Sequence, residues 1–154
     1  MDWFKSERAK WAAGQGANAV TLVPNPAVKA IADGFRAGWQ ATGKPAAAMP
    51  LMGLTRHVVV ADSDAKAQEI ARAAYGPWRK SMAFLWEWYG VEFLIASIYP
   101  GDFDALQKAG MGIAGSPQTV RRWVADLVAE TGITYLLCDP VFGSMPFVAL
   151  SALP

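Results

Sequence analysis

Three features of this sequence could do chemistry: a glycine motif, a single histidine and a single cysteine. Gly110, Gly112 and Gly115 spell G-x-G-x-x-G in front of a predicted helix, which is the spacing of a dinucleotide-binding turn. In a dinucleotide-binding domain that turn follows a buried strand, whereas residues 103–109 have a half-polar, helical pattern. The context therefore predicts a flexible glycine loop rather than a phosphate site.

The cysteine, Cys138, has no histidine near it in the sequence that could activate its thiol. A catalytic thiolate is therefore not expected, and a packed, small apolar side chain is favoured. The histidine, His57, lies in TRHVVVA toward the amino end of a predicted strand, where alternation places Thr55, His57 and Val59 on one face. We expect a structural or partly exposed histidine. No metal site is expected, and no catalytic residue is assigned.

These residues are carried by an alternating series of helices and strands. Apolar, β-prone runs predict strands over residues 19–23, 54–61 and 133–138. Helical periodicity and capping residues predict helices over 6–14, 25–39, 103–108 and 117–131, and a long one from about 63 that kinks or restarts at Gly76 and Pro77. Strands separated by helices indicate right-handed βαβ crossovers and a parallel sheet.

The clearest of these units is GSPQTVRRWVADLVAETGITYLLCDPVFG, near the carboxyl end. Ser116 can cap the helix, Pro117 suits its first position, and Gly132 ends it. Between them the apolar residues recur at helical spacing: Val120, Trp123, Val124, Leu127 and Val128. The run that follows is almost continuously apolar, which is typical of a parallel strand buried on both faces.

This unit and three upstream segments resemble one protein family. The upstream segments are SERAKWAAGQGANAV, GLTRHVVVADSDAKAQEIARAAYGPW and the aromatic run after it. In order and spacing, they resemble the bacterial luciferase-like, flavin-dependent monooxygenases over most of the chain. The resemblance implies a TIM (β/α)₈ barrel, of which this chain would supply roughly the second, C-terminal half.

Length limits how much of a barrel is present. A (β/α)₈ barrel takes about 250 residues, or about 200 at the short end, whereas this chain has 154. We therefore predict an α/β fold that is a partial TIM barrel, with about three parallel strands and flanking helices in a single domain over residues 1–154. The closing SMPFVALSALP is too short for the full helix that a barrel requires there, so the final helix is expected to be truncated.

The composition also indicates an incomplete barrel. Hydrophobic residues make up 53% of the chain and charged residues only 18%, against about 25% charged residues in an ordinary soluble domain. We therefore expect an exposed apolar patch that a partner chain, a second copy or further chain would cover. Six aromatic residues cluster after the long helix, and we rank them as core first, interface second and ligand wall last: Phe84, Trp86, Trp88, Tyr89, Phe93 and Tyr99.

The barrel resemblance also implies where a site would lie. Active sites of barrels lie at the carboxyl ends of the strands, so Cys138, Asp139 and Phe142 would border a substrate pocket, while His57 would lie toward the opposite, stability face. In the family, a polar segment at the start of the helix after the fifth strand holds the flavin phosphate. Ser6 is the matching position here and Lys5 could add charge, although an ordinary helix cap explains Ser6 as well.

Other global features favour few partners. The formal net charge is +1 with scattered basic residues, so neither nucleic acid nor an anionic membrane is favoured. No apolar run approaches the roughly 18 residues that span a bilayer, the amino terminus lacks a signal-sequence pattern, and one cysteine fits a reducing cytoplasm. A cytoplasmic protein is expected.

Two functions remain open. The resemblance implies a fragment or truncated relative of these monooxygenases, in which reduced FMN and molecular oxygen would oxidise a small organic substrate. Activity of this chain alone is doubtful, because the half that supplies most of the pocket is absent. The alternative is a non-catalytic half-barrel that self-associates or complements another chain, because open sheet edges are usually paired or covered.

Overall fold

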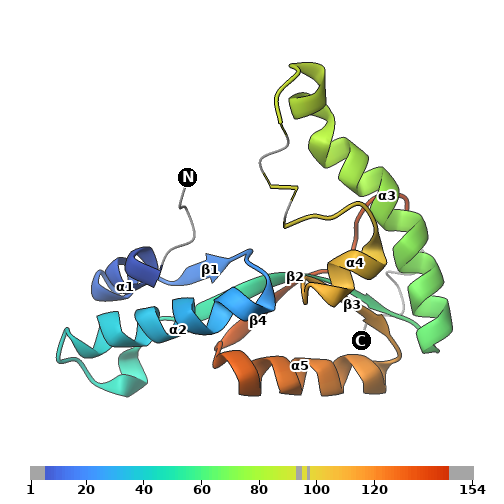
Figure 1. The fold of residues 1–154 in the computed structure, drawn as a ribbon. Helices are drawn as coiled ribbons and strands as arrows, with labels where there is room; N and C mark the ends of the chain where they lie inside the picture. Colours follow the sequence, from blue (N-terminus) through green and yellow to red (C-terminus); the bar gives the residue numbers. More distant parts are fainter. Residues whose placement is uncertain (1–5, 93–94, 97, 146–154) are drawn as a thin grey trace. The chain divides into compact units, whose positions relative to one another are not determined.

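The computed structural model describes residues 6–92, 95–96 and 98–145 (Figure 1). The chain forms two compact units, one of residues 1–55 and 124–137, the other of residues 56–123 and 138–154. Two strands and one helix run through both units, so each unit is described with the parts of these elements that it holds.

The first unit contains two helices that precede and follow a short strand. They are α1 (Ser6–Gly14), β1 (Ala19–Thr21) and α2 (Asn25–Gln40), followed by the short 3₁₀ helix η1 (Ala46–Ala48). The start of β2 (Met52–Val60) lies parallel to β1, with Ala19 opposite Met52 and Thr21 opposite Leu54. The later part of α5 (Pro117–Thr131) and the start of β4 (Tyr135–Asp139) complete this unit.

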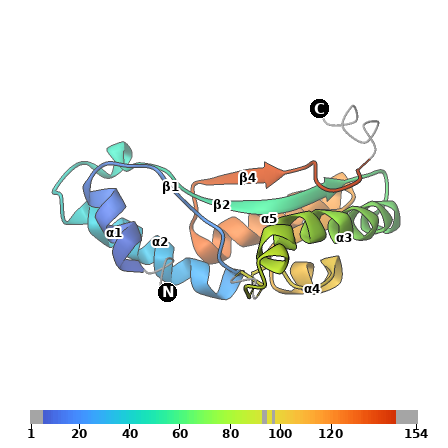
Figure 2. The ribbon, with the colours of Figure 1, turned by 90° about the horizontal axis from the view of Figure 1, so that it is seen from above.

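Helix α1 lies directly against α2, as both ribbon views show (Figures 1 and 2). Two glycines one turn apart on α2 make this possible. A Cβ on Gly34 would lie 2.8 Å from the carbonyl oxygen of Ser6, and a Cβ on Gly38 would overlap the carbonyl oxygen of Lys10. Because any side chain at these positions would meet the α1 backbone, the glycines fix how closely the two helices approach.

The second unit has a buried core on the later half of β2. It contains α3 (Asp64–Trp88), α4 (Phe103–Lys108), β3 (Gly112–Gly115), the first turns of α5 and the end of β4. β3 is parallel to β2, from His57 opposite Gly112 to Val60 opposite Gly115. Small residues on α3 let the helix pack closely, and the core is formed by Val59, Ala67, Ala71, Ala74, Tyr75, Ile98, Tyr99, Phe103, Leu106, Met111, Ala114 and Phe142.

The predicted α/β class with parallel strands and flanking helices is confirmed, but the described residues form four strands in one sheet where about three were predicted. The prediction of a flexible glycine loop at 110–115 was wrong, because Gly112–Gly115 is the fully buried strand β3. A Cβ on Gly112 would lie 3.1 Å from the carbonyl oxygen of His57, so the glycine permits close packing on β2. Strand preference alone misses such a segment, because glycine is depleted in strands.

Two further predictions need correction. Helix α3 runs through Gly76 and Pro77 as one helix of 25 residues, so the predicted restart does not occur. β4 pairs with β2, but its residues are only half-buried or exposed, so it is not the strand buried on both faces that its apolar sequence indicates. Apolar composition shows what a strand could bury, and no described part of this chain covers β4 completely.

The ends of the helices follow their sequence signals. Ser63 and Asp102 cap α3 and α4 by accepting hydrogen bonds from the backbone N–H groups of Lys66 and Ala105. Gly132 ends α5 with a φ of 67°, a conformation that glycine adopts at little cost. The predicted truncated final helix at Phe147–Leu153 lies outside the described residues, as does Lys5.

Candidate functional site

His57 lies in a cage of four aromatic rings in the second unit. The cage is formed by Tyr75 and Trp78 of α3, Tyr99, and Phe142 after β4, with ring centroids 4.5–6.1 Å from that of His57. The hydroxyl of Tyr75 donates to the carbonyl of Pro100 (2.9 Å), and this ties α3 to the segment before α4. The histidine is only 4% exposed, so it does not face solvent.

The polar neighbour of His57 is Asp139, the last residue of β4. Nδ1 of His57 lies 3.2 Å from Oδ2 of Asp139, without the geometry of a hydrogen bond. Burial lowers the pKa of His57, and the nearby Asp139 carboxylate only partly offsets this. The imidazole is therefore neutral at pH 7 and lies beside the half-exposed Asp139 side chain.

Two more polar groups are buried on this side of the sheet. Arg56 is 1% exposed, and loss of hydration lowers its pKa to about 10, so it keeps its charge at pH 7. Burial raises the pKa of Tyr99, and the charge of Asp139 raises it further. The phenol is therefore protonated and uncharged at neutral pH.

The predicted pocket-rim residues do not share one environment. Phe142 is buried in the core against His57 and Phe103, whereas Cys138 is exposed and Asp139 is half-exposed. The prediction of a packed, buried Cys138 was wrong, because Cys138 is exposed. Partial loss of hydration raises the pKa of the Cys138 thiol, so it is not an activated nucleophile.

His57 differs in part from its prediction. It is structural, as expected, but it is the sixth of nine residues in β2 and does not lie toward the amino end of the strand. The strand begins at Met52, two residues earlier than predicted, which moves His57 into its second half. Asp139 lies at the end of β4 and is half-exposed, so its carboxylate could contact a ligand.

Of the two predicted flavin-phosphate residues, Ser6 lies in the first unit and Lys5 lies outside the described residues. Ser6 is the first residue of α1 and is half-buried, and its backbone packs on Gly34. Glu7 follows it in the first turn, where a negative charge stabilises the helix dipole but would repel a phosphate group. The phosphate role of Ser6 and Lys5 stays a prediction.

The amino end of α5, after the glycine motif, is occupied by a carboxylate of this chain. Asp64 of α3 accepts hydrogen bonds from the backbone N–H of Ser116 (2.6 Å) and the hydroxyl of Thr119 (3.0 Å). These bonds, the backbone one first, lower the pKa of Asp64. Because Asp64 takes the place of an anion at this helix end, the Gly110–Gly115 segment is not a phosphate-binding turn.

Replacing Asp64 by asparagine is expected to lower the melting temperature at pH 7. A carboxyl group whose pKa is lowered on folding stabilises the protein above its unfolded pKa, about 3.8, and loses that effect as pH falls through its folded pKa. The difference between wild type and variant should therefore shrink toward pH 3, as followed by circular dichroism. Asp62→Asn, an exposed neighbour, serves as the control, and equal melting temperatures at pH 7 would contradict the capping role.

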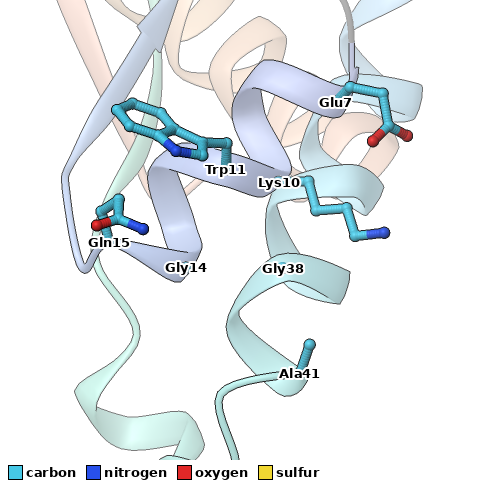
Figure 3. A pocket seen from close by; sticks show the side chains of 7 residues that line it. All are labelled: Glu7, Lys10, Trp11, Gly14, Gln15, Gly38 and Ala41. Atoms are coloured by element: carbon cyan, nitrogen blue, oxygen red, sulfur yellow. The ribbon is translucent and has the colours of Figure 1, made fainter.

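A hollow of about 340 Å³ lies between α1 and α2 in the first unit (Figure 3). It is lined by Glu7, Lys10, Trp11, Gly14, Gln15, Gly38 and Ala41. In Figure 3, Glu7 and Lys10 extend on one side of α1 and Gln15 on the other. The opposite charges of Glu7 and Lys10 favour neither an anion nor a cation, so we assign no ligand to this hollow.

The aromatic run of residues 84–99, which begins within α3, is divided between core and surface. Tyr99 is buried, whereas Phe84, Trp88 and Tyr89 are 52%, 70% and 74% exposed. The first-ranked prediction, that the run is core, was therefore wrong for these three residues, and Phe93 lies outside the described residues. Residues 84–91 form the exposed apolar surface that the composition led us to expect.

The described residues contain no candidate membrane span and no candidate metal site. None of the helices there is both long and apolar enough to cross a membrane. Over the same residues, no three His, Cys, Asp or Glu side chains come together in a way that could hold a metal ion.

Comparison with known proteins defines the fold class. No protein-family model matches the chain. Over 96% of its length, it is similar to the crystal structure of monooxygenase RslO1 from Streptomyces bottropensis, with a TM-score of 0.63 and 20% identity. It is also similar, with a TM-score of 0.58 and 19% identity over 91% of its length, to the oxygenating constituent of 3,6-diketocamphane monooxygenase from Pseudomonas putida, solved with FMN.

A curated relative extends the comparison. The uncharacterized protein y4wF of Sinorhizobium fredii is 31% identical over 145 residues, which are 94% of this chain and 42% of that protein. The chain likewise spans only 41% and 40% of the two monooxygenases. The expected partial-barrel fold is therefore confirmed, since nearly the whole chain has the fold of about two fifths of these two monooxygenases.

Proposed function

We propose that this chain is the C-terminal portion of a luciferase-like, FMN-dependent monooxygenase and forms a single partial-barrel domain. The observation that carries the proposal is the similarity of nearly the whole chain to the fold of two monooxygenases, one of them solved with FMN. In this role it would take part in the oxidation of a small organic substrate by molecular oxygen. A cytoplasmic location fits a chain with one free cysteine.

The residues of this chain would hold the cofactor and substrate rather than react. Ser6 at the start of α1, with Lys5 before it, would bind the flavin phosphate, because a helix start offers free N–H groups. Cys138 and Asp139 would line the substrate pocket, with His57 and the buried Phe142 behind them. FMN, when bound, would supply the redox chemistry.

Titration of the chain with oxidised and reduced FMN tests the proposal. Stoichiometric binding is expected, followed by flavin fluorescence, with a dissociation constant that rises about tenfold in Ser6→Ala as one charge-assisted hydrogen bond is lost. Ser81→Ala, at an exposed position on α3, is the matched control. Absence of binding at high micromolar FMN would reject a flavin role for this chain alone.

The second candidate is a non-catalytic half-barrel that complements another chain or a second copy. The half-exposed strand β4 favours it, since its Leu137 is exposed although it lies in a parallel sheet. Parallel strands are normally covered on both faces. A flavin-free oligomer in the same titration would support this candidate over the first.

A further inference from the structure

The carboxyl half of α3 is a helix with almost no core of its own. Among the ten residues from Arg79 to Trp88, only Ala83 is buried. Helical segments of this length are marginal in water and depend on packing of an apolar face. This part of α3 does carry an apolar face, but no described residue covers it.

That face, which we call the α3 surface, consists of Phe84, Leu85, Trp88, Tyr89 and Val91, all more than half exposed. Phe84 and Trp88, four residues apart, already contact one another, with ring centroids 5.7 Å apart. Leu85, Trp86, Tyr89 and Val91 line a hollow of about 320 Å³, large enough to receive an aromatic side chain. The surface therefore has both projecting rings and a hollow that could receive them.

The area of the α3 surface is sufficient for a dimer. A large aromatic side chain can bury about 150–250 Å², so the exposed parts of these five residues amount to about 600 Å² per copy. Two copies would bury about 1,200 Å², which is the lower limit for a specific, stable interface. Aromatic side chains are also the type enriched at the centre of interfaces.

Charges beside this surface define the direction of pairing. Lys80 and Glu87 are both exposed, lie two turns apart on one side of the helix, and make no ion pair within the described part of the chain. When two such helices pack antiparallel about an axis near Ala83, Lys80 of each copy lies opposite Glu87 of the other. A parallel arrangement would place equal residues at the same level and lose this match.

We propose that two copies of this chain associate through the α3 surface as a twofold-symmetric, antiparallel helix pair. A twofold axis makes the interface self-complementary, so one favourable pair of charges occurs twice. The proposal depends only on α3 in the second unit. It is independent of flavin binding and of closure of a barrel, and it can fail or succeed without them.

Sedimentation of the purified chain between about 1 and 100 µM tests this proposal. A monomer–dimer equilibrium is expected, and Trp88→Glu should leave only monomer while the circular dichroism spectrum stays that of the folded chain. A chain that remains monomeric at 100 µM would overturn the proposal. So would an oligomer that Trp88→Glu does not weaken, because another surface would then hold it.

Charge reversal tests the direction of pairing. Lys80→Glu and Glu87→Lys should each raise the dimer dissociation constant about tenfold, because each creates two like-charge pairs across the axis. The double variant should return it to within about twofold of wild type. Arg121→Glu, an exposed change on α5, is the control. Failure of the double variant to recover would exclude the antiparallel arrangement.

Discussion

Replacing Gly38 by alanine is expected to lower the free energy of unfolding by about 3 kcal/mol, at the upper end of the cost of overpacking. The added Cβ would overlap the carbonyl oxygen of Lys10, a backbone atom that cannot rotate away. Relief requires α1 to move off α2, which would expose Ala13, Val28 and other residues of the core of the first unit. Urea denaturation followed by circular dichroism measures the loss.

Gly34 and Gly76, two other glycines within helices, provide comparisons for this prediction. At Gly34 the added Cβ would lie 2.8 Å from the carbonyl oxygen of Ser6, so Gly34→Ala should cost less than Gly38→Ala. At Gly76, in α3, it would meet nothing within 4 Å beyond its chain neighbours. Gly76→Ala should therefore change stability by less than about 1 kcal/mol, because the helix preference of alanine is opposed by the restriction that Pro77 places on the residue before it. If Gly38→Ala proved as stable as Gly76→Ala, the close contact between α1 and α2 would be wrong.

The sequence predicts the helices of this chain better than its strands. α1 and α4 match their predicted ranges, because caps such as Asp102 and the terminal glycines are local signals. The strand β3 was not predicted, because only contact with β2 explains why a segment with glycines at 112 and 115 forms a strand. The residues of one strand do not show which distant strand pairs with it.

The site shows the same limit. The sequence singled out His57 and Asp139 separately, but no pattern indicates that residues 82 positions apart lie 3.2 Å from each other. Arg56 was not singled out at all, because burial of an arginine depends on the tertiary fold. Only the resemblance to a barrel indicated where Asp139 would lie. In a barrel the carboxyl ends of the strands meet at the active site, and this predicted Asp139 as a rim residue.

The free energy of unfolding should depend on pH near the ordinary pKa of histidine, because the buried His57 titrates abnormally there. His57 is the only histidine of the chain, and its pKa in the folded protein lies below the ordinary value of 6.5. As pH falls below 6.5 the unfolded chain takes up a proton that the folded chain does not bind, so the free energy of unfolding decreases. The slope approaches about 1.4 kcal/mol per pH unit until the folded pKa is reached.

Between pH 7 and pH 5 the free energy of unfolding should therefore fall by up to about 2 kcal/mol, as measured by urea denaturation at fixed ionic strength. His57→Phe, which retains a ring in the aromatic cage but cannot titrate, should give a flat profile over the same range. In Asp139→Asn the decrease should continue to lower pH, because removal of the carboxylate lowers the pKa of the buried imidazole further. A wild-type profile as flat as that of His57→Phe would mean that the folded protein accepts the proton as readily as the unfolded chain. That result would refute the neutral, buried histidine beside Asp139.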